Sequence, residues 1–237
     1  MILNLHKERS IKDVPIWVLP TLLITLIMQI VWHNFRPEPL AQAVDLANPP
    51  TNELFKVASF GDQVALSKLT MLWLQAHDNQ PGISIPFKQL DYTTVAQWLG
   101  AIQELDPRGH YPLLSAVRVF GEVPVPEKQR KMLAFVEREF HKNPDQRWPW
   151  LAHAAFVAKH RLKDQQLALK FAESLAEKTT GENVPSWVKQ MRIFLLEDMG
   201  EIESAKVLLG GLLESGQITD PHEQAFLYQR LEELEKK

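Results

Sequence analysis

The stretch Gln103–Pro112, QELDPRGHYP, gathers residue types that could do chemistry, because Asp106, Arg108 and His110 flank one glycine. A carboxylate and an imidazole can exchange a proton, and a guanidinium can hold an anion. The same stretch also carries the signals of a helix boundary: a proline and a glycine interrupt a helix, and Pro112 suits the first turn of the next one. We interpret it as the end of one helix and the start of another.

The composition argues against several kinds of function. The chain has 237 residues, of which 45% are hydrophobic and 23% charged, and its net charge of −3 gives no reason to expect a nucleic-acid partner. The absence of cysteine excludes disulfides, thiolate catalysis and cysteine zinc sites. Walker, GxSxG, HExxH and GxGxxG motifs are also absent. We therefore expect no cofactor.

The histidines and acid pairs do not form a recognisable site in the sequence. His153 and His160 lie seven residues apart on one expected helix, about 10.5 Å along its axis, too far to share one metal ion. Pairs such as Glu197 and Asp198 suit a solvated helix face. We expect no metal site and no catalytic residue, with an envelope-polymer hydrolase as the less favoured alternative.

The segment Val14–Trp32, VPIWVLPTLLITLIMQIVW, predicts a transmembrane helix over residues 14–33. It contains no charged residue, and about 20 apolar residues span a bilayer core. Trp17 and Trp32 lie near its ends, where aromatic rings favour the headgroup region. Pro20 is expected to remove one backbone hydrogen bond, which membrane helices tolerate.

The flanking charges predict the orientation of this helix. Lys7, Arg9 and Lys12 precede it and only Arg36 follows closely, which places residues 1–13 in the cytoplasm as a tail. Everything after the helix then lies outside the cytoplasmic (inner) membrane, in the periplasm of a Gram-negative-type envelope. Two alternatives stay open: a signal peptide cleaved at AQA, residues 41–43, and a buried core helix.

Residues 34–51 contain four prolines and predict a linker, which could reach roughly 55 Å when fully extended. The remaining residues, 52–237, show helix signals and no convincing strand. The expected helices cover residues 53–59, 62–78, 92–105, 111–122, 126–141, 149–162, 165–179, 186–199, 201–215 and 222–236.

These helices repeat with a period of 37 residues. The shift superposes Trp150 on Trp187 and Ala168 on Ala205, and it defines helix pairs at 111–147, 148–184 and 185–221. Residues 222–236 would form a polar cap. Each helix pair has three expected core positions: a large residue, the residue four positions later, and an apolar residue three positions after that. These positions are Leu113, Val117 and Phe120; Trp150, Ala154 and Val157; and Trp187, Met191 and Phe194.

Three stretches resemble tetratricopeptide (TPR) repeats: AIQELDP (101–107), REFHKNPD (138–145) and MGEIESAKVLLGGLL (199–213). The chain departs from the family in its period, in the small position, where Val117 and Met191 stand, and in Gly181, which replaces a unit-ending proline. The resemblance implies an all-α, TPR-like α-solenoid of antiparallel helix hairpins that binds protein partners in a concave groove, preceded here by the transmembrane helix.

Charge is unevenly distributed along the expected repeats. Residues 108–170 carry 12 Lys and Arg against 6 Asp and Glu, whereas residues 171–237 carry 7 against 13. Alignment with the TPR pattern puts Arg118 and Arg192 at one groove-facing position, with Lys159 one turn further on. These cations would hold a carboxylate-bearing partner segment; Trp148 and Tyr111 complete the candidate partner-binding set.

We therefore expect a membrane-anchored interaction scaffold or assembly factor for an envelope complex, with partners that include an acidic protein segment and, through the N-terminal helix, the membrane. The alternative from another class is a structural subunit of a larger membrane complex, in which the transmembrane helix itself makes the main contacts.

Overall fold

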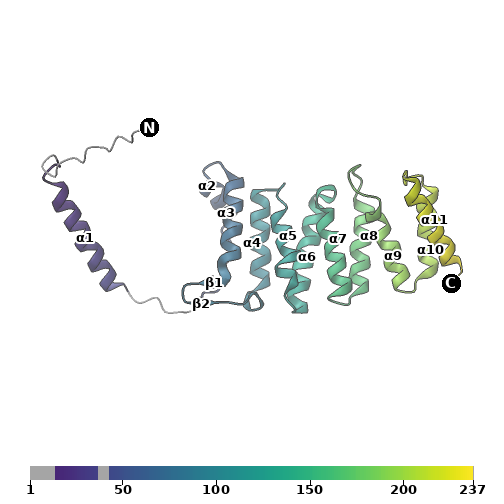
Figure 1. Cartoon of the computed structure of the whole chain (residues 1–237), viewed down its shortest axis with the longest axis horizontal. Coiled ribbons are helices and arrows are strands. Elements are labelled where there is room, and N and C mark those ends of the chain that lie inside the picture. Colours follow the sequence, from purple (N-terminus) through teal and green to yellow (C-terminus); the bar gives the residue numbers. More distant parts are fainter. Residues whose placement is uncertain (1–13, 37–42, 237) are drawn as a thin grey trace, which may run out of the picture. The chain divides into compact units, whose positions relative to one another are not determined.

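The computed structural model describes residues 14–36 and 43–236, and the chain divides into two compact units, residues 1–42 and 43–237. Within the described ranges the fold is all-α: helix α1 belongs to the first unit, and α2 to α11 follow one another in the second (Figure 1). The strands in these ranges are β1 (Asn79–Gln80) and β2 (Ile83–Ser84), which pair as an antiparallel hairpin. This hairpin lies in residues 79–91, between two predicted helices.

Helix α1 (Val18–Phe35) is 18 residues long, has a mean hydropathy of 1.5, and is long and apolar enough to cross a membrane. It begins later than the predicted span and ends later. Pro20 therefore lies in the first turn, where its missing N–H would have had no partner, so the expected loss of a hydrogen bond is wrong. The predicted tail, residues 1–13 with its basic residues, and the AQA site, apart from residue 43, lie outside the described residues.

Among the described residues of the second unit, the α-helices α2 to α11 stand side by side in chain order (Figure 1). They are α2 (Asn52–Ala58), α3 (Gln63–Gln75), α4 (Tyr92–Leu105), α5 (Tyr111–Arg118), α6 (Pro126–Lys142), α7 (Pro144–His160), α8 (Gln165–Lys178), α9 (Trp187–Asp198), α10 (Ile202–Glu214) and α11 (Pro221–Glu235). Several begin at an aspartate whose side chain accepts a backbone N–H of the first turn. At α4, the N–H groups of Thr93 and Thr94 lower the pKa of the capping Asp91 to about 2.

Several polar contacts in the second unit join residues 34 to 36 positions apart in the chain. The Tyr111 hydroxyl donates to Gln75 (36 residues apart, 3.1 Å), and Arg130 Nη1 donates to Asp164 (34 apart, 2.7 Å). The backbone N–H of Thr180 donates to the Asp145 carboxylate (35 apart, 2.7 Å). A contact to the next helix pair at this separation agrees with the 37-residue period.

The stretch Gln103–Pro112 forms the turn between α4 and α5. The Gln103 amide donates to the main-chain oxygens of Asp106 (3.0 Å) and Gly109 (2.8 Å), and Asp106 Oδ1 accepts the Gly109 N–H (3.1 Å). A Cβ at Gly109 would lie 2.7 Å from Asp106 Oδ2, so a larger residue does not fit there without a shift. These groups hold a helix boundary together.

Helix α7 begins five residues before its predicted start, and Pro149 lies inside it. The additional first turn is held by two contacts that the sequence pattern does not show. Arg147 is buried against α6, and the Asp145 carboxylate accepts the backbone N–H groups of Thr180 and Gly181 at 2.7 and 2.9 Å. These contacts offset the hydrogen bond that Pro149 removes.

The last part of the predicted linker is fastened to the second unit. The Gln80 side-chain amide accepts from the Val44 N–H and donates to the Val44 carbonyl oxygen, both at 2.8 Å, as a neighbouring strand would. Leu46 is buried, and Trp98 Nε1 donates to the Ala47 oxygen at 2.7 Å. Within the described part of the predicted linker, residues 43–51, the contacts to the second unit thus begin at Val44.

Candidate functional site

The expected core positions differ in burial between the helix pairs. Leu113, Val117 and Phe120 are fully buried in the first pair, as the period predicts. Their counterpart Trp187 on α9 is 46% exposed, and Met191 is half-buried. The expectation that Trp187 is a core residue is therefore wrong.

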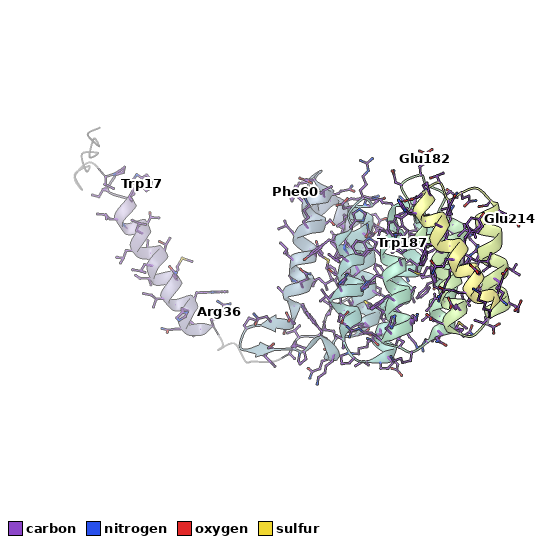
Figure 2. All side chains as sticks on the ribbon, turned by 45° about the vertical axis from the view of Figure 1, so that its right-hand side comes forward. Trp17, Arg36, Phe60, Glu182, Trp187 and Glu214 are labelled. Carbon is purple, nitrogen blue, oxygen red and sulfur yellow. The ribbon has the colours of Figure 1, made fainter. Side chains whose placement is uncertain are left out.

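A hollow of about 260 Å³ lies between α7 and α9 at these positions. Helix α5 packs directly against α7, whereas an open space lies between α7 and α9. The hollow is lined by Ala155, Phe156, Lys159 and His160 from α7 and by Trp187 (labelled in Figure 2), Met191, Phe194 and Leu195 from α9. Its lining is mostly aliphatic and aromatic and contains no carboxylate.

Polar groups at the hollow come from the last turn of α7. Lys159 forms an ion pair with Asp198 at the end of α9, and both side chains are partly exposed. The His160 ring packs on the Phe156 ring with 4.5 Å between centroids, and Phe156 is 53% exposed. The hollow can thus accept an apolar side chain, with a cation and an imidazole beside it to meet a polar neighbour.

The two predicted aromatic residues have different surroundings. Trp148 is half-buried and contacts Trp187 edge-on, with ring centroids 5.4 Å apart and an interplanar angle of 77°, so it supports one wall of the hollow. Tyr111 is 46% exposed and lies on α5, where its hydroxyl is engaged by Gln75 of α3. It does not line the hollow.

The three predicted cations are not brought together around one space. Lys159 lines the hollow, but Arg118 and Arg192 do not. Arg118 is exposed at the last residue of α5, near His153 of α7. Arg192 is half-buried, and its Nε has no hydrogen-bond partner although it is shielded from solvent.

His153 is a half-buried side chain that stacks on Phe156 at 5.9 Å. Burial lowers its pKa below the ordinary value of 6.5, the positive charges of Arg118 and Arg161 lower it further, and Glu122 acts in the opposite direction. Among the residues that the structure describes, no group of three or more His, Asp or Glu side chains is placed to hold a metal ion.

Sequence reasoning missed Phe156, His160, Met191 and Phe194 as site residues. Met191 and Phe194 occupy expected core positions of the 37-residue period. The period alone cannot show that, in one helix pair, no neighbouring helix covers these positions. Phe156 gave a usable signal, because it is a large apolar residue next to, and outside, the recurring core positions Ala154 and Val157. Comparison with known proteins gives no match: no family model, curated protein or solved structure matches this chain.

Proposed function

We propose that this chain is a membrane-anchored, TPR-like α-solenoid that binds a segment of a partner protein in the hollow between α7 and α9. One observation carries the proposal: positions that are core in the first helix pair line an open apolar hollow at Trp187 and Met191. Exposing such residues is unfavourable in water, so a partner side chain that covers them gains binding free energy.

The partner segment would present an aromatic or large aliphatic side chain followed by an acidic residue. The apolar lining receives the first, and Lys159, which already pairs with Asp198, can exchange this carboxylate for that of the partner. The basic character of residues 108–170 favours approach of an acidic segment. Such a protein would serve as a scaffold or assembly factor for an envelope complex.

The test is photo-crosslinking in native membranes with the full chain and its anchor. A benzophenone amino acid at Phe156 should give one defined adduct. Met191→Trp, which fills the hollow, should abolish that adduct, whereas Val207→Trp, at an exposed position of α10 outside the hollow, should leave it unchanged. An adduct of equal yield in both variants contradicts the proposal.

The orientation of α1 forms part of the same proposal, with its N-terminus in the cytoplasm and residues 43–237 in the periplasm. Because the chain has no cysteine, Glu182→Cys in an exposed loop gives a single label site (Figure 2). A membrane-impermeant maleimide should label it in intact spheroplasts. Labelling that requires lysis would overturn the orientation, and N-terminal sequencing of the mature chain distinguishes a retained helix from a cleaved one.

A further inference from the structure

A second hollow, of about 450 Å³, lies at the other end of α7, where the first turn of this helix meets the end of α6 and the turn after α4. Its lining is mainly polar and charged and includes three cations, Arg108, Lys142 and Arg147. We call this space the Arg147 hollow. It shares no residue with the hollow between α7 and α9, so its ligand is independent of the proposed protein partner.

Two buried side chains of the Arg147 hollow each leave one polar atom without a partner. Gln103 is 1% exposed and Arg147 is 5% exposed. They meet at the Pro107 main-chain oxygen, which accepts from Gln103 Nε2 at 3.4 Å and from Arg147 Nη2 at 3.2 Å. Gln103 Oε1 and Arg147 Nε have no hydrogen-bond partner among the described residues. Because unpartnered buried groups are unfavourable, a ligand that brings an acceptor to Arg147 and a donor to Gln103 is stabilised here.

The carboxylates of this hollow do not cancel its positive charge. Glu139 is 1% exposed, but its Oε2 pairs with Arg147 Nη1 at 2.9 Å and its Oε1 with Lys142 Nζ at 2.8 Å. The other carboxylate, Glu104, is exposed and accepts a hydrogen bond from the first residue of α2. The Arg108 guanidinium is exposed and forms no ion pair with another described residue. Arg108 and Arg147 Nε thus remain to meet an anion.

The first turn of α7, a helix of 17 residues, adds to this preference. The first N–H groups of a helix have no partner within it, and their partial positive charge attracts anions. The N-cap residue Asn143 does not cap them, because its amide donates to Gln146 Oε1 at 2.8 Å. The Asp145 carboxylate of the same turn is engaged by two backbone N–H groups after α8. Helix and side chains therefore favour the same kind of ligand.

The unpartnered Gln103 oxygen narrows the chemistry of this anion. An ionised carboxylate or a sulfate only accepts hydrogen bonds and would leave Gln103 Oε1 without a donor. A phosphate group that keeps one proton offers oxygens to Arg108 and Arg147 and an O–H to Gln103. We propose that the Arg147 hollow binds a phosphate group, as the free ion or as a phosphomonoester, through Arg108, Arg147 and the first turn of α7.

Calorimetric titration of inorganic phosphate into the full chain, in a maltoside detergent that carries no phosphate, tests this site. The natural chain should bind one phosphate saturably. Arg108→Gln removes an exposed cation and one charge-assisted hydrogen bond, and should raise the Kd at least about tenfold. Lys178→Gln removes the same charge at an exposed position at the end of α8 and should leave the Kd unchanged. Absence of saturable binding, or an equal loss in both variants, overturns the proposal.

Two further measurements test the ligand and its position. Sulfate should bind at least about tenfold more weakly than phosphate, because it brings no donor for Gln103; equal affinity overturns the phosphate assignment. Hydrogen exchange at the Asp145 and Gln146 amides should slow on addition of phosphate, and slowing confined to other segments overturns the placement. Glycerol 3-phosphate separates the two sources: if it displaces inorganic phosphate, the hollow accepts a lipid-type phosphomonoester, and if it does not, the ligand is the free ion.

Discussion

Arg147 and Glu139 form a buried ion pair between α7 and α6. Arg147 Nη1 lies 2.9 Å from Glu139 Oε2 and 2.8 Å from the Glu139 main-chain oxygen, and its Nη2 donates to the Pro107 oxygen at 3.2 Å. Glu139 Oε1 accepts from Lys142 at 2.8 Å. Both members of the pair are almost inaccessible to solvent. One side chain thus joins two helices and the turn after α4.

Removing one member of this pair should destabilise the chain strongly. Arg147→Ala leaves a carboxylate buried without its main partner, and we expect a loss of about 3–5 kcal/mol in the free energy of unfolding. The double variant Arg147→Met/Glu139→Leu should lose less than the single variant, because no buried charge remains. Urea unfolding of the full chain in detergent, followed by circular dichroism, measures both. Arg130→Ala, in a more exposed pair with Asp164, should cost below about 1 kcal/mol; an equal cost at both sites would contradict the assignment.

His153 should make stability fall on mild acidification. Its pKa is lowered in the folded chain, chiefly by burial, so the unfolded chain takes up this proton first as the pH falls through 6.5. The free energy of unfolding should therefore decrease from pH 7 toward pH 5, and His153→Gln should flatten that profile. Unfolding curves at several pH values give the difference between the two chains. Identical slopes would show that His153 titrates alike in both states.

The Tyr92 hydroxyl should lose its proton at a higher pH than that of an ordinary tyrosine. Burial raises its pKa to about 12, and its hydroxyl donates to the Phe120 oxygen at 3.1 Å. Between the ordinary value of 10.0 and 12, the unfolded chain loses this proton while the folded chain keeps it, so stability falls as the pH rises through this window. Phenolate absorbance at 295 nm should show a component near pH 12 that Tyr92→Phe lacks. That variant should cost about 1 kcal/mol at neutral pH, from one lost hydrogen bond.

Gln80 should control the fastened segment that follows the anchor. Gln80→Leu removes both hydrogen bonds to Val44 and should release residues 43–50 without melting the helices. Faster hydrogen exchange at the Val44 amide and a new protease cleavage in this segment are the expected signs. Gln89→Leu, at an exposed position in the same loop, is the matched control. An unchanged exchange rate in Gln80→Leu would mean that Leu46 and the Trp98 bond to Ala47 hold the segment without Gln80.

The sequence determined the helices well because their signals are local. Helix signals in the sequence predicted α4 as Tyr92–Leu105, a proline predicted the start of α6 at Pro126, and the apolar run predicted α1 within a few residues. The turn after α4 was also predictable, since proline and glycine act on their own backbone. Local rules failed at α7, where Pro149 looks like a helix start and distant partners of Asp145 and Arg147 add a turn before it.

Tertiary structure alone decided which faces are covered. A period of 37 residues places Leu113 and Trp187 at one repeat position, but whether such a residue is buried depends on how closely the neighbouring helix approaches. The same holds for α3, where Leu69 and Leu72 are exposed to solvent in the folded chain. Burial and long-range hydrogen bonding depend on residues far apart along the chain. For this reason the sequence predicted an all-α repeat, and only the folded chain located the hollow between α7 and α9.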